Sequence, residues 1–186
     1  PDKVHIRSYN PPTKPENHQV SRAVDAILAS ERPVIYAGGG TISSNASKEL
    51  RELNDLIDAP VTNTLMGLGV FPGTHKRFLG MLGMHGTYQA NMAMHNADLI
   101  IALGARFDDR ITNAPDKFAP RAKVIHFDVD HSSVSKIIEA DIAVFGQIKD
   151  SLQAINNHLK TKIDEIDNEK LAPWHQQISD WKEKHG

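Results

Sequence analysis

The stretch DLIIALG at residues 98–104 decides the fold of this chain, because it sets the apolar run Leu99–Leu103 between an aspartate and a glycine. A short, continuous apolar run bounded by turn residues is typical of a strand that is buried on both faces. Strands of this kind occur in parallel sheets that helices cover on both sides. The stretch therefore predicts an α/β fold, and we interpret the rest of the chain around it.

Further strands and helices are expected on either side of this stretch, in alternation. The segments whose apolar and β-forming residues predict strands are 34–37, 59–64, 123–130 and 141–146. Apolar residues at helical spacing predict helices over 20–28, 50–57, 85–97 and 132–138, and a long helix from Lys149 to Ile163. Ser43 or Ser44 is the expected N-cap of the second helix. The alternation predicts a doubly wound, mostly parallel sheet of about six strands with helices on both faces.

The two ends of the chain differ in composition from the part between them. Residues 1–17 are rich in proline and show little periodicity, so we expect a linker from a preceding domain. Residues 18–163 hold the predicted strands and helices and form the expected central domain. Residues 164–186 are charged and carry Trp174 and Trp181 on one helical face, so we expect a linker or helix leading towards a following domain. The alternative, that the tryptophans pack back on the same domain, stays open.

Composition narrows the classes of function. The 186 residues carry a formal net charge of -2 with scattered basic residues, so nothing favours a nucleic-acid or anionic-membrane partner. The absence of cysteine excludes disulfides and thiolate metal sites. No apolar run reaches the ~18 residues that a membrane span needs. We therefore expect a cytoplasmic protein that binds neither nucleic acid nor membranes.

Glycines, charges and apolar residues follow several predicted strands at the point where each strand ends. In open parallel sheets, ligands bind outside the carboxyl ends of the strands, where helix N-termini direct free N–H groups outward. Glycines allow close approach of the backbone, and charges of both signs beside apolar side chains suit a ligand with a phosphate part and a flat aromatic part. The sequence therefore predicts a dinucleotide site. The segments concerned are 38–40, 64–67, 82–87, 104–110 and 128–130.

The glycine turn at 38–40 does not match the fingerprint of NAD enzymes. That fingerprint has the pattern Gly-x-Gly-x-x-Gly and an acidic residue at the end of the second strand, which binds the ribose hydroxyls. Here Ser43 stands in place of the third glycine, and the second strand ends in Thr62, Asn63 and Thr64. NAD is therefore disfavoured. A tight turn that binds nothing is the alternative for these glycines.

The charged loop GARFDDR at 104–110 has two interpretations. Arg106 and Arg110 can donate charge-assisted hydrogen bonds to a pyrophosphate. Asp108 and Asp109 can then hold the arginines in place or accept hydrogen bonds from a ribose or a ring N–H. In the alternative, the loop is braced by its own salt bridges.

No metal site is predicted in this chain. His126, Asp128 and Asp130 share one face of a predicted strand, but no further acidic cluster accompanies them. His85 and His95 stand ten positions apart on a predicted helix, and this spacing turns them to different faces. Neither set has the arrangement that a metal ion requires.

Three motifs resemble one family. They are MLGMHGTYQANMAMHNADLIIALGARFDDR at 81–110, TLMGLG at 64–69 and HFDVD at 126–130. In this order they resemble the central FAD-binding domain of the catalytic (large) subunit of acetohydroxyacid synthase, or acetolactate synthase, of the bacterial biosynthetic type. The resemblance extends over roughly residues 20–160. It implies the Rossmann-like central domain of a thiamine diphosphate enzyme.

The resemblance also implies a reaction, although not one that this chain performs alone. Members of the family condense two pyruvates, or pyruvate and 2-oxobutyrate, to an acetohydroxy acid with release of carbon dioxide in branched-chain amino-acid biosynthesis. Thiamine diphosphate and Mg²⁺ carry that transferase chemistry and are bound by the flanking domains, while FAD binds chiefly to the central domain. The implied partners are those flanking domains, further catalytic subunits in a homo-oligomer, and a separate regulatory small subunit. No catalytic residue is expected here.

Carried over by motif, the resemblance assigns a set of FAD contacts. The last contact departs from the family pattern, because Gln147 stands where the family usually has aspartate; we expect weakened or altered contact there rather than loss. A cofactor-free scaffold or nucleotide-binding domain of a related thiamine diphosphate enzyme is the alternative. The assigned residues are Gly38, Gly39, Gly40, Thr64, Leu65, Met66, Leu82, Gly83, Met84, His85, Gly104, Ala105, Arg106, Phe107, Asp108, Asp109, Arg110, Asp128, Val129, Gln147 and Ile148.

Overall fold

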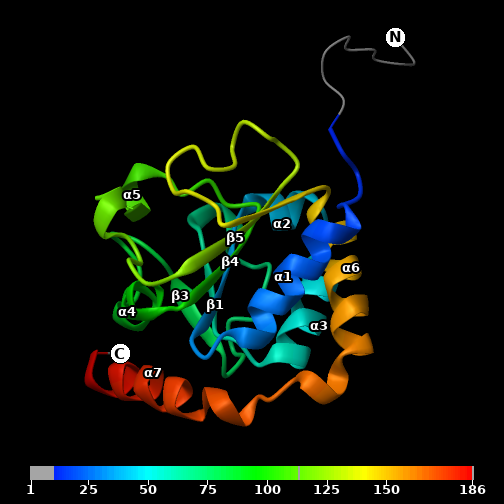
Figure 1. Ribbon diagram of the computed structural model, residues 1–186. Coiled ribbons are helices and arrows are strands. Elements are labelled where there is room, and N and C mark those ends of the chain that lie inside the picture. Colours follow the sequence, from blue (N-terminus) through cyan, green and yellow to red (C-terminus); the bar gives the residue numbers. More distant parts are fainter. Residues whose placement is uncertain (1–10, 113, 186) are drawn as a thin grey trace.

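A parallel β-sheet forms the centre of the molecule in the computed structural model, which describes residues 11–112 and 114–185 (Figure 1). Within these residues the sheet has six strands in the order β3-β2-β1-β4-β5-β6, and every neighbouring pair is parallel. The predicted α/β class and strand number are confirmed. The strands are β1 Pro33–Ala37, β2 Val61–Asn63, β3 Phe78–Met81, β4 Leu99–Leu103, β5 Lys123–Asp128 and β6 Ile142–Phe145.

Helices pack on both faces of the sheet, as expected for a doubly wound fold. One face is covered by α1 (Asn17–Ala29), α3 (Ser47–Ile57) and α6 (Ile148–Thr161), which pack against one another (Figure 1). The other face is covered by α4 (Tyr88–Asn96) and α7 (Ala172–His185). Two short helices, α2 Gly39–Ser43 and α5 Asp109–Thr112, follow β1 and β4. The sheet therefore separates two apolar cores.

Alternation along the central strands divides their side chains between the two cores. In β1, Ile35 faces the core of α1, α3 and α6, whereas Tyr36 faces the core of α4 and α7. Tyr36 pairs with Ala102 of β4, which in turn pairs with His126 of β5. Tyr36 and His126, which both carry polar groups, thus flank Ala102 on one face of the sheet, and all three side chains are buried.

Three details of the predicted helices are wrong. The segment at 132–138 forms turns rather than a helix, because the Asp130 carboxylate accepts hydrogen bonds from the Ser132 backbone N–H and hydroxyl at 2.9 and 2.8 Å. Ser135 then adopts a left-handed φ of 58°, which interrupts helical backbone. Neither expected serine is an N-cap: α3 begins after Ala46, and Ser44 ends α2.

The third detail concerns the helix predicted over 85–97. Its helical part is α4, which begins at Tyr88 because the Thr87 hydroxyl accepts a hydrogen bond from the Ala90 N–H at 3.3 Å and caps the first turn. Strand β3, just upstream, was not assigned from sequence. It is only four residues long and contains Gly80 at φ 91°, and glycine is depleted in strands.

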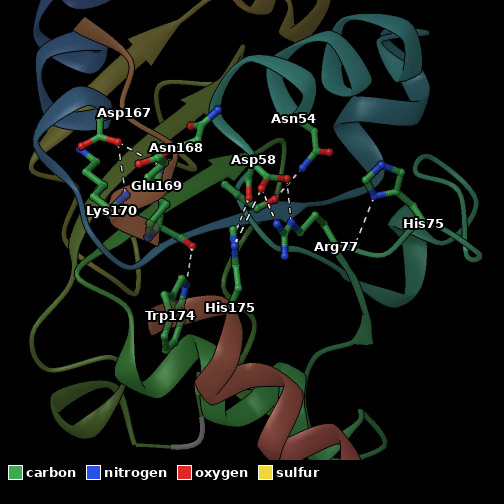
Figure 2. A network of polar contacts seen from close by, with 12 residues as sticks. Asn54, Asp58, His75, Arg77, Asp167, Asn168, Glu169, Lys170, Trp174 and His175 are labelled. Atoms are coloured by element: carbon green, nitrogen blue, oxygen red, sulfur yellow. Dashed lines mark hydrogen bonds and ion pairs between the residues drawn. The ribbon is translucent and has the colours of Figure 1, made fainter. Parts of the chain in front are cut away.

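The C-terminal segment packs back on the domain, which was the alternative left open by the sequence (Figure 2). Trp174 is 2% exposed, and its Nε1–H donates to the backbone carbonyl of Pro33 at 3.1 Å. The ring of Trp181 meets that of Trp174 edge-on, with centroids 5.8 Å apart. Nearby, the Asn168 amide donates to the carbonyl of Leu56, near the end of α3, at 3.0 Å. The segment therefore binds carbonyl groups that the domain presents at one end.

Candidate functional site

A cleft opens at the carboxyl end of the sheet, between the turn after β1 and the loop after β4. Its volume is about 710 Å³, within the range of ~300–1,000 Å³ usual for ligand pockets. Strand order reverses between β1 and β4, and ligands of open α/β sheets bind at such a point. The predicted residues that line the cleft are Gly39, Gly40, Thr64, Leu65, Met66, Gly104, Ala105, Arg106, Phe107, Asp108 and Asp128.

The other assigned residues whose side chains the structure describes do not line this cleft. Leu82 and Ile148 are buried in the two cores, whereas Met84 and His85 are exposed. Gly38, Gly83, Val129 and Gln147 complete this group. Asp109 and Arg110 begin α5, and their side chains lie outside what the structure describes. For all of these residues, contact with a cofactor stays a prediction.

Gln147 is held by neighbours on two sides. It is the N-cap residue of α6, and its backbone N–H donates to the Thr13 carbonyl at 3.0 Å. Its side-chain Oε1 accepts a hydrogen bond from the Ser44 hydroxyl at 3.3 Å. Ser43, the residue before Ser44, lines the cleft. Gln147, which stands where the family usually has aspartate, is thus connected to the cleft through Ser44 and Ser43 at the end of α2.

The glycines between β1 and α2 have two different roles. A Cβ at Gly38 would lie 2.2 Å from the Gly104 carbonyl oxygen, and one at Gly40 would lie 2.8 Å from the Gly104 Cα. These positions exclude side chains because the two loops touch, and the Gly40 N–H donates to the Gly104 carbonyl at 3.1 Å. A Cβ at Gly39 would instead meet the Met66 Cβ at 3.1 Å, and both of these residues line the cleft. Gly38 and Gly40 therefore join the loops, and Gly39 presents bare backbone to the cleft.

Phe107 anchors the charged loop. Its φ of 53° is unusual for a residue with a side chain, and its ring is buried. The ring lies between Tyr36 and His126, with centroid separations of 5.5 and 5.3 Å. This anchoring leaves Arg106 and Asp108 at the cleft, where their side chains are largely exposed and form an ion pair of 3.2 Å. An exposed pair of this kind contributes only ~0–1 kcal/mol, so both side chains remain available to a ligand.

Tyr36 is a cleft residue that the motifs missed. Its side chain is fully buried, it lines the cleft, and its hydroxyl has no hydrogen-bond partner among the described residues. Burial, with a smaller contribution from the charge of Asp108, raises the pKa of Tyr36, so the hydroxyl keeps its proton. The sequence feature that could have indicated Tyr36 is its hydroxyl group, which stands within the otherwise apolar strand PVIYA. The other lining residues that the motifs missed are Ile42, Ser43, Ile111 and Ser133.

His126 lies within β5, two residues before Asp128. Its ring is 1% exposed and its Nε2 is 4.0 Å from the Asp128 carboxylate. Burial lowers the pKa of His126 below 6.5, although the charge of Asp128 opposes this shift. The imidazole is therefore neutral at pH 7. The Asp128 carboxylate also accepts a hydrogen bond from the Asp130 N–H at 2.9 Å, which fixes it at the cleft wall.

Two further properties of the described residues bear on other classes of function. Within residues 11–112 and 114–185, no group of three or more histidine or acidic side chains is placed to hold a metal ion. None of the helices described there combines the length and apolar character needed to cross a membrane.

Comparison with known proteins identifies the family. Residues 20–155 match the family described as "Thiamine pyrophosphate enzyme, central domain". The chain belongs to this family. The fold agrees with the resemblance predicted from sequence, and the cleft contains residues of the motifs TLMGLG, GARFDDR and HFDVD. Membership also means that the full-length relatives of this central domain are thiamine pyrophosphate enzymes.

Proteins similar to this central domain are acetolactate synthases. The acetolactate synthase large subunit of Buchnera aphidicola subsp. Acyrthosiphon pisum (strain APS) is 51% identical over 182 residues, which are 98% of this chain and 31% of that protein. The isozyme 3 large subunit of Escherichia coli (strain K12) is 44% identical over 98% of this chain and 32% of its own length. The acetolactate synthase of Mycobacterium avium is 43% identical over 97% and 28%. The chain therefore spans about a third of the length of these relatives.

Proposed function

We propose that this chain is the FAD-binding central domain of an acetolactate synthase large subunit, and that the cleft between β1 and β4 holds the dinucleotide. The observation that carries the proposal is the composition of the cleft. Bare backbone at Gly39 and Gly104 and the charged side chain of Arg106 line the same cleft, which suits a pyrophosphate. Ile42, Leu65 and Met66 add exposed apolar surface, which suits a flat ring system.

The residues present fit this cofactor better than NAD. The second strand ends in Asn63, which is buried and donates to the Gly67 carbonyl at 3.0 Å, and Thr64 follows it. An NAD site needs an acidic side chain at that position for the ribose hydroxyls. The described part of β2 offers none. Asp128, at the end of β5, provides a carboxylate on the other side of the cleft.

The proposed activity of the full-length protein is that of the relatives named acetolactate synthase. It joins two pyruvates, or pyruvate and 2-oxobutyrate, into an acetohydroxy acid with loss of carbon dioxide. We propose that thiamine diphosphate and Mg²⁺ supply this chemistry in parts of the enzyme that the relatives possess beyond the matched third. The role of this chain is then to bind FAD and to support its neighbours in a cytoplasmic homo-oligomer with a regulatory subunit. Alone, it is expected to form no acetolactate.

A titration tests the binding proposal. The chain is titrated with FAD and, separately, with NAD, and binding is followed by the flavin fluorescence or by calorimetry. Saturable binding of FAD, absent for NAD and weakened by Arg106→Ala, supports the proposal. Arg51→Ala is the matched control, because Arg51 is exposed on α3 and does not line the cleft. Absence of FAD binding at millimolar concentration favours the alternative of a cofactor-free scaffold.

A further inference from the structure

Tyr36 has a buried hydroxyl that the protein itself leaves without a partner. The side chain is 0% exposed, and no hydrogen bond to the hydroxyl is formed from any other described residue. A hydroxyl in this position has lost its hydrogen bonds to water and has gained none in return. Because buried polar groups in native proteins are nearly always paired, the missing partner calls for an explanation.

The position of Tyr36 indicates where a partner would come from. The residue lines the cleft together with Gly39, Gly104 and Asp108. Its ring packs against Phe107 on one side, at a centroid separation of 5.5 Å, so the apolar core accounts for the ring but not for the hydroxyl. The protonated phenol is a hydrogen-bond donor. The wall of the cleft therefore contains a residue whose buried hydrogen-bond donor has no partner among the described residues.

We propose that the Tyr36 hydroxyl donates a hydrogen bond to an acceptor atom of the dinucleotide bound in the cleft, and that Tyr36 is a binding residue of this domain. This inference rests on the proposed function, because it needs the cleft to bind FAD. The acceptors available on a dinucleotide are phosphate, ribose or ribitol oxygens and ring nitrogens or carbonyls. Arg106 lines the same cleft with an exposed side chain, so the Tyr36 donor adds to the contacts that Arg106 offers.

The test compares Tyr36→Phe with the unchanged chain, because this substitution removes only the hydroxyl. We expect the dissociation constant for FAD to rise about fivefold to tenfold, as for the loss of one hydrogen bond. Without FAD, the midpoint of thermal unfolding is expected to stay the same or to rise, since the hydroxyl has no partner in the protein. Tyr88→Phe is the matched control: Tyr88 is 41% exposed and lies outside the cleft lining. This variant is expected to bind FAD as the unchanged chain does.

Four results would overturn the inference in different ways. Equal FAD affinity of Tyr36→Phe and the unchanged chain shows that the hydroxyl does not contact the ligand, while the proposed function stands. A lower unfolding midpoint without FAD shows that the hydroxyl has a partner inside the protein. Tyr36→Phe is also compared in a chain that already carries Asp108→Asn. If Tyr36→Phe weakens FAD binding as a single substitution but not in this second background, the hydroxyl acts on the Asp108 carboxylate instead of on the ligand. Failure of the unchanged chain to bind FAD overturns the proposed function and this inference with it.

Discussion

The indole Nε1–H of Trp174 donates to the backbone carbonyl of Pro33 at 3.1 Å, across 141 positions of the chain. Pro33 begins β1, so this bond joins the C-terminal helix to the first strand of the sheet, at the end opposite the cleft. The guanidinium of Arg32 lies over the same indole, 5.7 Å from its centroid. The C-terminal segment is therefore part of the fold, whatever lies beyond it in longer relatives.

Two substitutions of Trp174 are expected to destabilise the domain to different extents. Trp174→Phe keeps an aromatic ring but leaves the Pro33 carbonyl without its donor, which costs ~1–3 kcal/mol of the free energy of unfolding. Trp174→Ala also leaves a cavity, and such truncations cost ~3–5 kcal/mol. Urea unfolding followed by circular dichroism measures both losses. Trp181→Phe is the control, because Trp181 is only half-buried; a loss as large as that of Trp174→Phe would contradict the role given to the Pro33 bond.

Asp58 joins α3, β3 and α7 through its side-chain carboxylate and its backbone carbonyl. The Arg77 Nε donates to Asp58 at 2.7 Å, and the terminal guanidinium nitrogen of Arg77 also bonds this carboxylate (Figure 2). Arg77 precedes β3, and Asp58 ends α3 in the left-handed conformation. His175 of α7 contacts the Asp58 backbone carbonyl through its Nε2 at 3.0 Å. Burial acts to raise the pKa of Asp58, but the hydrogen bond and charge of Arg77 outweigh it and lower that pKa.

Arg77→Ala is expected to lower the free energy of unfolding by ~1.5–3 kcal/mol, because it removes two charge-assisted hydrogen bonds from a half-buried carboxylate. Lys160→Ala is the comparison, since Lys160 forms an exposed pair with Glu52. Exposed pairs contribute ~0–1 kcal/mol. Urea unfolding of both variants distinguishes them. Equal losses would mean that the Asp58 pair is no better than a surface ion pair.

Stability is expected to fall as the pH is lowered below about 6.5. Burial lowers the pKa of His126 and, together with the charges of Arg77 and Lys76, that of His175 below the ordinary value of 6.5, although Asp58 opposes the shift at His175. The unfolded chain therefore binds these protons more readily than the folded chain does. The stability that the neutral rings contribute is fully present above pH 6.5 and is lost as the pH falls toward the lowered values.

Urea unfolding at pH 7.5 and at pH 5.5 measures this loss. His175→Gln keeps an amide donor for the Asp58 carbonyl but does not titrate. Its loss of stability between the two pH values is expected to be smaller than that of the unchanged chain. His18→Gln is the control, because His18 is exposed. A His175→Gln variant with the full pH dependence would assign the effect to His126 or to other groups.

Local patterns could predict the sheet, but not every element. The run Leu99–Leu103 became the central strand β4, because five successive apolar residues exclude water only when both faces are covered. The segment at 132–138 carries helical spacing, but the Asp130 carboxylate captures the N–H and hydroxyl of Ser132 and holds turns instead. Competition between a side chain and the backbone for the same N–H groups is not visible in apolar spacing.

The cleft was predicted because carboxyl ends of parallel strands meet at one edge of a sheet, which brings Gly39, Arg106 and Asp128 together from the ends of three strands. Tyr36 was missed for a different reason. Apolar neighbours predict that it is buried, yet only the folded structure, in which its ring packs on Phe107 about 70 positions away, shows that its buried hydroxyl lacks a partner among the described residues. Whether a buried polar group has a hydrogen-bond partner depends on residues that only the folded structure brings together.

The turn after β1 contains two glycines with different roles: Gly38 is needed for the contact between two loops, and Gly39 faces the cleft. A Cβ at Gly38 would lie 2.2 Å from the Gly104 carbonyl oxygen, and neither backbone can move without parting the two loops. Gly38→Ala is therefore expected to lower the free energy of unfolding by more than ~2 kcal/mol. At Gly39 the new Cβ would meet the Met66 Cβ at 3.1 Å and the Met66 carbonyl oxygen at 3.5 Å, and a shift of a few tenths of an ångström relieves the closer contact. Gly39→Ala is expected to fold with nearly unchanged stability.

When FAD binding is measured instead of stability, the expected effect falls on Gly39→Ala. Gly39→Ala places a methyl group where the bare backbone lines the cleft, so we expect FAD affinity to fall about tenfold or more while the unfolding midpoint stays close to that of the unchanged chain. Gly73→Ala is the control for the loss of a glycine, because a Cβ there would be 4.0 Å from the Phe78 ring. Full FAD affinity in Gly39→Ala would mean that the dinucleotide does not approach this turn, and that the turn serves only to join β1 to α2.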